Sequence, residues 1–104
     1  MARVKGKVAI ISGASMGIGK ATSLLLAREG AAIVVADINE EEGKKVVSDI
    51  EAGGGKAIFV KLDVRKEEDW QAAMAATLAA FGQLDIAVNN AGIAYTGTVE
   101  STSL

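Results

Sequence analysis

The chain has 104 residues and a hydrophobic content of 50%, mostly Ala, Val, Ile and Leu with only 4% aromatic residues, which suits one α/β domain with a close-packed core. Its net charge is −2, and Lys and Arg are interspersed with Asp and Glu, so we expect neither nucleic-acid binding nor attachment to an anionic membrane. The sequence has no Cys, no His and no apolar stretch of membrane-spanning length, which excludes disulfides, thiol catalysis and His-ligated metals and favours a cytoplasmic protein.

The first predicted strand, residues 7–12, runs into a glycine-rich turn that opens a helix ending near Glu29. The turn reads Ser12-Gly13-Ala14-Ser15-Met16-Gly17-Ile18-Gly19-Lys20. Gly13 can adopt the positive φ of a sharp exit from the strand, Gly17 lets the backbone approach a pyrophosphate, and Gly19 leaves no Cβ between helix and sheet. Because the helix points its free N–H groups and positive dipole end at the turn, we predict a cradle for a diphosphate. A turn that only permits tight packing is the alternative.

The glycine spacing excludes two similar motifs. A P-loop has the pattern G-x-x-x-x-G-K-[ST], but here Ala14 stands at the first glycine and Ala21 follows Lys20. ATP chemistry is therefore disfavoured. The common dinucleotide pattern G-x-G-x-x-G does not match either, since the spacing is Gly13-x-x-x-Gly17-x-Gly19.

The second predicted strand, residues 31–36, follows a helix stop at Gly30 and ends in Asp37. The residues that recur at helical spacing in the preceding helix, and so form its predicted apolar side, are Ile18, Ala21, Thr22 and Leu25. A carboxylate at the end of the second strand lies beside the first turn, where it can accept hydrogen bonds from both hydroxyls of an adenosine ribose. A 2′-phosphate would meet like charge there, so Asp37 favours NAD over NADP. A capping or strand-end acid is the alternative interpretation.

A second helix is predicted from Asn39, whose capping-box-like start precedes a buried stripe of Val46, Val47 and Ile50. Residues 53–55 are three glycines, and we interpret them as a linker because a phosphate loop follows a strand rather than a helix. Residues 57–62 form the third predicted strand, and Asp63-Val64 lies at its exit.

A third helix is predicted over residues 66–81, and Gly82 ends it. One side of this helix carries large apolar residues, and we expect them to lie in the core rather than in a ligand site. These residues are Trp70, Met74, Leu78 and Phe81. The fourth strand, residues 84–88, delivers Asn89-Asn90-Ala91-Gly92 to the edge that holds the earlier motifs. Right-handed crossovers then predict the strand order 3-2-1-4, which is half of a doubly wound parallel sheet.

The glycine turn, Asp37, Asp63-Val64 and residues 89–92, in this order, resemble the N-terminal half of a classical short-chain dehydrogenase/reductase. The resemblance implies a Rossmann-like sheet, NAD as cofactor, and hydride transfer between nicotinamide and a small alcohol or ketone in the complete protein. It also implies a set of residues that bind the cofactor. These are Gly13, Ser15, Met16, Gly17, Ile18, Gly19, Asp37, Ile38, Asp63, Val64, Asn90, Ala91 and Gly92.

The resemblance assigns roles within this set. The Asp63 carboxylate would accept from the exocyclic amine of adenine, and the Val64 backbone N–H would donate to a ring nitrogen. Residues 90–92 would line the nicotinamide side, while Asn89 would tie the central strands together through the hydroxyl of Ser12, which replaces the usual Thr. Met16 and Ile38 stand where NADP-using relatives often carry a cation, which again favours NAD. An acid at a strand exit and an Asn-Gly turn are the alternatives for the two later motifs.

The catalytic residues of the family, a Ser, an Asn and a Tyr-x-x-x-Lys pair, lie downstream of these motifs. The only Tyr is Tyr95, and the residue four positions later is Val99, so we nominate no catalytic residue. We therefore expect residues 1–104 to be the dinucleotide-binding domain of an enzyme, incomplete at the C-terminus, inactive alone and homo-oligomeric when complete. The alternative is a stand-alone nucleotide-binding or regulatory module without turnover.

Overall fold

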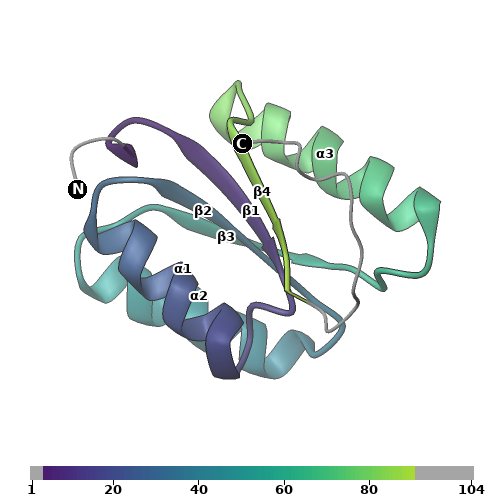
Figure 1. The fold of residues 1–104 in the computed structure, drawn as a ribbon, viewed down its shortest axis with the longest axis horizontal. Coiled ribbons are helices and arrows are strands. Elements are labelled where there is room, and N and C mark those ends of the chain that lie inside the picture. The colour runs from purple at the N-terminus through teal and green to yellow at the C-terminus, as the bar shows by residue number, and fades with distance from the viewer. Residues whose placement is uncertain (1–3, 91–104) are drawn as a thin grey trace.

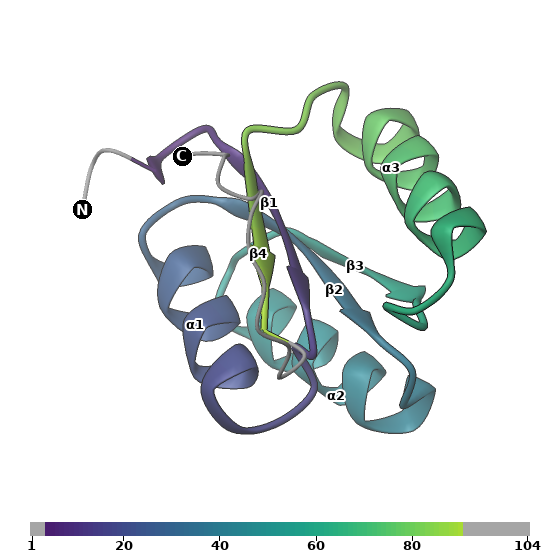
Figure 2. The same cartoon turned by 45° about the vertical axis from the view of Figure 1, so that its right-hand side comes forward.

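The computed structural model describes residues 4–90, which form a four-stranded parallel sheet with helices on both faces (Figure 1). Strands and helices alternate along the chain as β1 (Val8–Ser12), α1 (Gly17–Arg28), β2 (Ala32–Asp37), α2 (Glu40–Ala52), β3 (Ala57–Lys61), α3 (Glu67–Phe81) and β4 (Ile86–Asn89). The strand order is β3-β2-β1-β4 and every pair is parallel, which confirms the predicted topology. Figure 2 shows α1 and α2 on one face of the sheet and α3 on the other.

The core has two layers because the central strands are buried on both faces. Ile11 and Val35 point toward α1 and α2, where they pack with Val46 of α2. Ile10 and Val34, their neighbours along the same strands, pack in the second cluster with Ala73 of α3. A strand covered on both faces needs apolar residues at every position, which explains the continuous apolar runs in the sequence.

Most element boundaries lie within one residue of the prediction, and local chemistry explains them. Asn39 caps α2, since its Oδ1 accepts a hydrogen bond of 3.0 Å from the N–H of Glu42. Gly82 ends α3 in the left-handed conformation with φ 78°. β4 begins at Ile86, two residues later than predicted. The reason lies in Asp85, whose Oδ2 accepts from the Val8 N–H at 2.9 Å, so the side chain takes the place of a regular ladder bond.

The predicted apolar side of α1 is wrong. Ile18 and Leu25 are 74% and 47% exposed, whereas the buried positions of the helix are Gly19 and Ser23. The Ser23 hydroxyl donates to the Gly19 carbonyl at 2.8 Å, so this small polar residue is buried without an unsatisfied group. Small side chains let α1 lie close to the sheet, and the larger apolar residues are displaced to its flanks.

The predicted buried side of α3 is correct only in part. Trp70 and Phe81 are half-buried and pack against the second cluster, as expected. Met74 and Leu78 are exposed, and the positions buried in their place are Ala73 and Thr77. As in α1, the fully buried positions of the helix are small residues.

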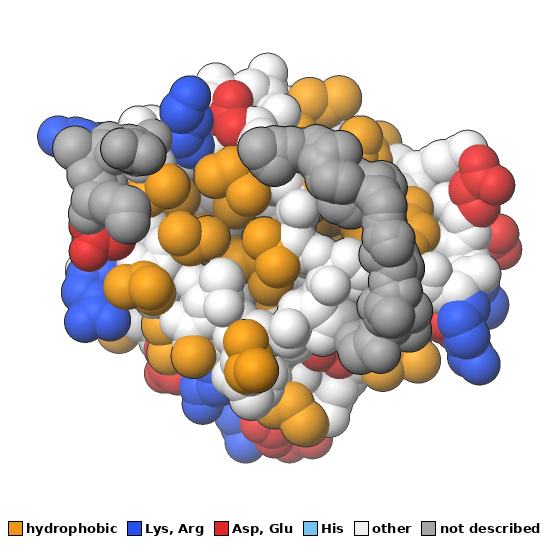
Figure 3. Space-filling model, viewed as in Figure 1, with side chains coloured by type: hydrophobic (Ala, Val, Ile, Leu, Met, Phe, Trp, Pro, Cys, Tyr) orange, Lys and Arg blue, Asp and Glu red, His pale blue; other side chains and the backbone are white. Residues whose placement is uncertain are grey.

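Hydrophobic side chains gather on the face in front of α1 and β4 (Figure 3). Leu25 and Ile18 are exposed on α1, and Ile86 and Val88 of β4 are half-buried. β4 is an edge strand of the sheet formed by residues 4–90. Within the same range, no helix has the length and apolar character needed to cross a membrane.

Candidate dinucleotide-binding site

The four predicted motifs meet at the carboxyl edge of the sheet, because each follows the end of a different parallel strand. They line two adjoining cavities of about 440 and 120 Å³, which share Gly13 and Asp37. The larger cavity is lined by Gly13, Ser15, Met16, Gly17, Ile18, Asp37 and Asn90. The smaller one is lined by Gly13, Asp37, Ile38, Leu62, Asp63 and Val64. Of the predicted cofactor-binding residues that the structure describes, only Gly19 lines neither cavity. Ala91 and Gly92 are outside the described residues.

The three glycines of the turn have different structural roles. Gly13 and Gly17 have φ values of 64° and 60°, in the left-handed region that favours glycine. Apart from its chain neighbours and the backbone of its own helix, nothing lies within 4 Å of the position that a Cβ of Gly17 would occupy, so the backbone is open to a ligand there. A Cβ on Gly19 would instead collide with the Gly13 carbonyl oxygen and lie 2.7 Å from Asn90 Nδ2. Because Gly19 has no side chain, the start of α1 can lie close to Gly13 of the turn and to Asn90 after β4.

The N-terminus of α1 differs from those of the other helices. Its N-cap, Met16, makes no side-chain capping bond, and its first turn contains no acidic residue. By contrast α2 has three acids in its first turn and the cap Asn39, and α3 also has three acids. The first N–H groups of α1 and its positive dipole end thus lack a negative partner from the helix itself, next to the open backbone of Gly17. This arrangement suits an anion such as a diphosphate.

Asp37 is fixed at the junction of the two cavities. Its Oδ2 accepts from the backbone N–H of Ser15 at 3.0 Å and from the Ser15 hydroxyl at 2.7 Å, and its Oδ1 accepts from the Asn39 N–H at 2.9 Å. Partial burial opposes ionisation, but the hydrogen bonds from Asn39 and Ser15 outweigh it and hold the pKa of Asp37 below its ordinary value. The side chain is therefore an ionised acceptor at neutral pH, and Ser15 orients it.

Ser12 joins β1 to β4, as the sequence predicts. Its hydroxyl donates to Asn89 Oδ1 at 2.8 Å and accepts from the backbone N–H of Asn90 at 3.0 Å. Ser12 and Asn89 are direct partners in the parallel register of β1 and β4. The hydroxyl thus fixes the start of the 89–92 motif at the wall of the larger cavity.

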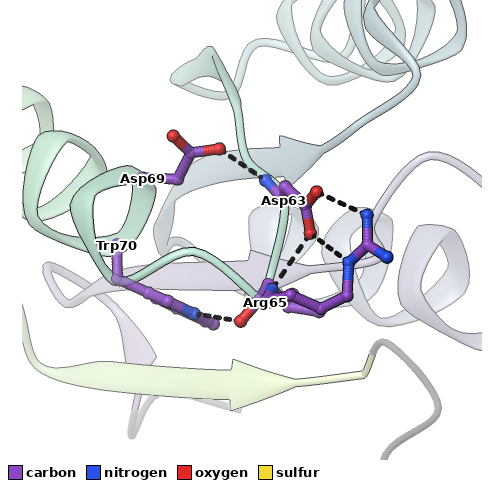
Figure 4. Close-up of polar contacts among 5 residues, drawn as sticks. Asp63, Arg65, Asp69 and Trp70 are labelled. Carbon is purple, nitrogen blue, oxygen red and sulfur yellow. Dashed lines mark hydrogen bonds and ion pairs between the residues drawn. The ribbon is translucent and has the colours of Figure 1, made fainter.

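The Asp63-Val64 segment is held by three residues that the sequence reasoning did not assign to the site (Figure 4). The Asp63 N–H donates to Asp69 Oδ2 at 2.9 Å, and Trp70 Nε1 donates to the Val64 carbonyl at 3.0 Å. The Arg65 guanidinium donates to both carboxylate oxygens of Asp63, and this ion pair holds the pKa of Asp63 far below its ordinary value. Two signals existed: a buried indole N–H usually has a partner, and an acid at the third helical position often reaches back to a free N–H.

Another cavity, of about 300 Å³, lies at the opposite edge of the sheet. It is lined by Gly6, Lys7, Val8, Ala27, Gly30, Ala31, Ala32, Gly54, Gly55, Lys56, Phe81 and Gln83. None of the predicted site residues contributes to it. Ligands of open parallel sheets bind at the carboxyl edge, so the two adjoining cavities lined by the motif residues, and not this cavity, define the candidate site.

Known proteins resemble this chain over nearly its whole length. The family model "short chain dehydrogenase" matches residues 7–104. The chain is 45% identical over 102 residues to the 2,5-dichloro-2,5-cyclohexadiene-1,4-diol dehydrogenase LinX of Sphingobium indicum, covering 98% of this chain and 41% of the relative. It is 46% identical over 103 residues to the cyclopentanol dehydrogenase of Comamonas testosteroni, covering 99% and 41%.

The fold also matches a solved structure, a 7α-hydroxysteroid dehydrogenase complexed with NADH and 7-oxo glycochenodeoxycholic acid. The TM-score is 0.82 with 39% sequence identity, over 85% of this chain and 34% of that chain. The chain thus spans about 41% of the length of the curated relatives that it matches. On the family match, the sequence identity and the shared fold, the chain belongs to the short-chain dehydrogenase family.

Proposed function

We propose that residues 1–104 bind NAD(H) in a dehydrogenase/reductase that transfers hydride between nicotinamide and an alcohol or ketone. One observation carries the proposal: motifs from four strand ends line two adjoining cavities beside a helix N-terminus that has neither a side-chain cap nor an acid. A diphosphate over Gly17 would face the free N–H groups of α1, and the adenosine would extend past Asp37 toward Asp63. The NADH in the related hydroxysteroid dehydrogenase supports this assignment.

The residues around Asp37 favour NAD over NADP. The Asp37 carboxylate is ionised and half-buried, so a ribose hydroxyl can donate to it whereas a 2′-phosphate would be repelled. The Ser15 hydroxyl can rotate away from Asp37 Oδ2 and so release one acceptor position to the ribose. Lys61 and Lys66 line a neighbouring cavity together with Asp63 and Asp69, and their charges balance. We infer no net positive site for a 2′-phosphate.

The bound cofactor would supply the hydride acceptor or donor, and the described residues would orient it and hold it in place. The relatives named for cyclopentanol and for a cyclohexadiene diol support a cyclic secondary alcohol as the substrate class. The alcohol would be deprotonated by residues outside the motifs found here, so residues 1–104 alone are expected to be inactive. A cytoplasmic homo-oligomer completes the proposal.

The proposal is tested by measuring the binding of NAD and NADP to the full-length protein, by calorimetry, for the wild type and for Asp37→Ala. Wild type is expected to prefer NAD. Asp37→Ala should weaken NAD roughly 10-fold or more, the value of a hydrogen bond to a charged group, and should reduce the preference over NADP. Asp49→Ala removes an exposed acid of α2 and serves as the charge-matched control. An unchanged ratio of NAD to NADP affinity in Asp37→Ala would contradict the role of Asp37.

A further inference from the structure

One side chain dominates the hydrogen bonding of the Asp63 carboxylate. Oδ1 accepts from the backbone N–H of Arg65 and from Arg65 Nε, both at 3.0 Å, and Oδ2 accepts from Arg65 Nη2 at 2.8 Å. Each carboxylate oxygen has about two acceptor positions. Oδ1 is therefore saturated by Arg65, and Oδ2 keeps one position for another donor.

The guanidinium binds Asp63 from outside the smaller cavity, which we call the base cavity because the adenine is proposed to bind there. Asp63 lines the cavity of about 120 Å³ with Val64 and Ile38, and Arg65 is absent from the residues that line it. The Asp63 side chain is 13% exposed while that of Arg65 is 80% exposed. In Figure 4 Arg65 and Asp69 approach Asp63 from different sides, so the carboxylate and the backbone N–H of Asp63 are held independently.

On this geometry, and resting on the proposed function, we propose that Arg65 is a specificity-determining residue that fixes Asp63 as an oriented, ionised acceptor and so makes the cavity select a 6-aminopurine over a 6-oxopurine. The remaining position on Oδ2 suits one N–H of an exocyclic amine. A 6-oxo group is an acceptor, and it would face a carboxylate that has no proton to donate.

The effect comes from orientation more than from the energy of the pair. An exposed ion pair contributes little to stability, so the loss of Arg65 should leave the fold nearly unchanged. A bidentate guanidinium, however, holds both carboxylate oxygens in one plane, which Lys cannot do. Without it the carboxylate of Asp63 retains only the bond from the Arg65 backbone N–H, and its Oδ2 is free to turn.

The test compares NAD with its hypoxanthine analogue, in which a 6-oxo group replaces the 6-amino group. Dissociation constants of both are measured at neutral pH on the full-length protein, for wild type, Arg65→Ala, Arg65→Lys and Lys66→Ala. Both ligands carry the same diphosphate, so their ratio cancels any general effect of losing a positive charge. Lys66→Ala is the matched control, because Lys66 is a neighbouring exposed cation that makes no side-chain bond to Asp63.

Wild type should prefer NAD by roughly 10-fold or more, as for a hydrogen bond between an amine and a charged acceptor. Arg65→Ala should reduce that preference to about 2-fold, with Arg65→Lys intermediate and Lys66→Ala unchanged. An unchanged preference in Arg65→Ala, or an equal loss in Lys66→Ala, overturns the inference.

Asp63→Asn separates failure of the inference from failure of the proposed function. An amide can donate to a 6-oxo group, so this variant should shift the preference toward the hypoxanthine analogue. If Asp63→Asn shifts the ratio while Arg65→Ala does not, the base cavity is correct and only the role of Arg65 is wrong. If wild type binds neither ligand, the proposed function itself is wrong.

Discussion

Gly19→Ala is the smallest change that tests the close contact between α1 and the glycine turn. The added methyl group would collide with the Gly13 carbonyl oxygen and lie 2.7 Å from Asn90 Nδ2 and 2.8 Å from the Gly13 carbonyl carbon. Gly13 cannot easily yield, because it follows β1 directly and has a φ of 64°. The start of α1 must then move away from the turn.

The magnitude follows from two opposing effects. Ala is a better helix former than Gly by about 1 kcal/mol, whereas forcing a methyl group into a filled space costs about 1–3 kcal/mol. We expect Gly19→Ala to lower the free energy of unfolding by about 0–2 kcal/mol, the difference between these two effects. Binding of NAD should weaken by roughly 10-fold or more, because the N–H groups that face the diphosphate move with the helix.

Gly43→Ala is the matched control. Gly43 is also a buried glycine within a helix, and its Cβ would collide with the ring of Phe59; neither residue lines the two cavities of the candidate site. Urea unfolding should show a loss in Gly43→Ala similar to or smaller than that in Gly19→Ala, since a ring can turn aside. Calorimetry should show a dissociation constant for NAD near the wild-type value in Gly43→Ala and a weaker one in Gly19→Ala. Wild-type binding of NAD by a folded Gly19→Ala protein would refute the argument.

Two further predictions concern the strands that hold the site. Ser12→Ala removes the two hydrogen bonds that the Ser12 hydroxyl makes with Asn89 Oδ1 and the Asn90 N–H, so urea unfolding should show a loss of about 1–3 kcal/mol, which Ser12→Thr restores. A wild-type midpoint in Ser12→Ala would contradict the strand-joining role. The pKa of Asp85 is lowered, chiefly by the bond from the Val8 N–H, so its stabilisation is fully present above its ordinary pKa near 3.8 and is lost as the pH falls through the lower folded value. The difference in unfolding free energy between wild type and Asp85→Asn should therefore narrow below about pH 4, and a constant difference from pH 7 to pH 3 would exclude this linkage.

The sequence was sufficient for the topology because each strand is an apolar run that ends in a chemically distinct residue. The runs before Gly13, Asp37 and Asp63 have the length of buried strands, and helices with clear start and stop signals separate them. Right-handed crossovers then leave one strand order, which the structure shows. The same logic predicted that residues far apart in the chain share one edge of the sheet.

The buried faces of the helices were harder to predict from hydrophobic periodicity, because that pattern is defined by the large apolar residues and not by the small ones. In α1 and α3 the fully buried positions are Gly19, Ser23, Ala73 and Thr77, while Leu25 is exposed. Both pairs of buried residues are four positions apart, so they form one row along the helix surface. Serine and threonine are compatible with burial here because their hydroxyls donate to the carbonyl four residues earlier.

Contacts of Asp63 and Asp37 depended on turn conformations that spacing alone does not define. Arg65 lies two residues after Asp63, a separation at which the side chains of a helix do not face one another. Here the turn that brings the Arg65 N–H to Asp63 Oδ1 lets the guanidinium reach the carboxylate as well. The bond from Ser15 to Asp37 similarly requires the end of β2 to lie beside the first turn.

The first and fourth motifs form one physical unit, although they are more than 70 residues apart in the sequence. The Ser12 hydroxyl accepts from the Asn90 N–H, and the Asn90 amide in turn lies where a side chain of Gly19 would be. Any residue larger than glycine at position 19 therefore displaces the turn, the helix N-terminus or Asn90. The turn proposed to face a diphosphate and the segment proposed to lie beside the nicotinamide are thus positioned together, so a change in either one should alter cofactor binding at both ends.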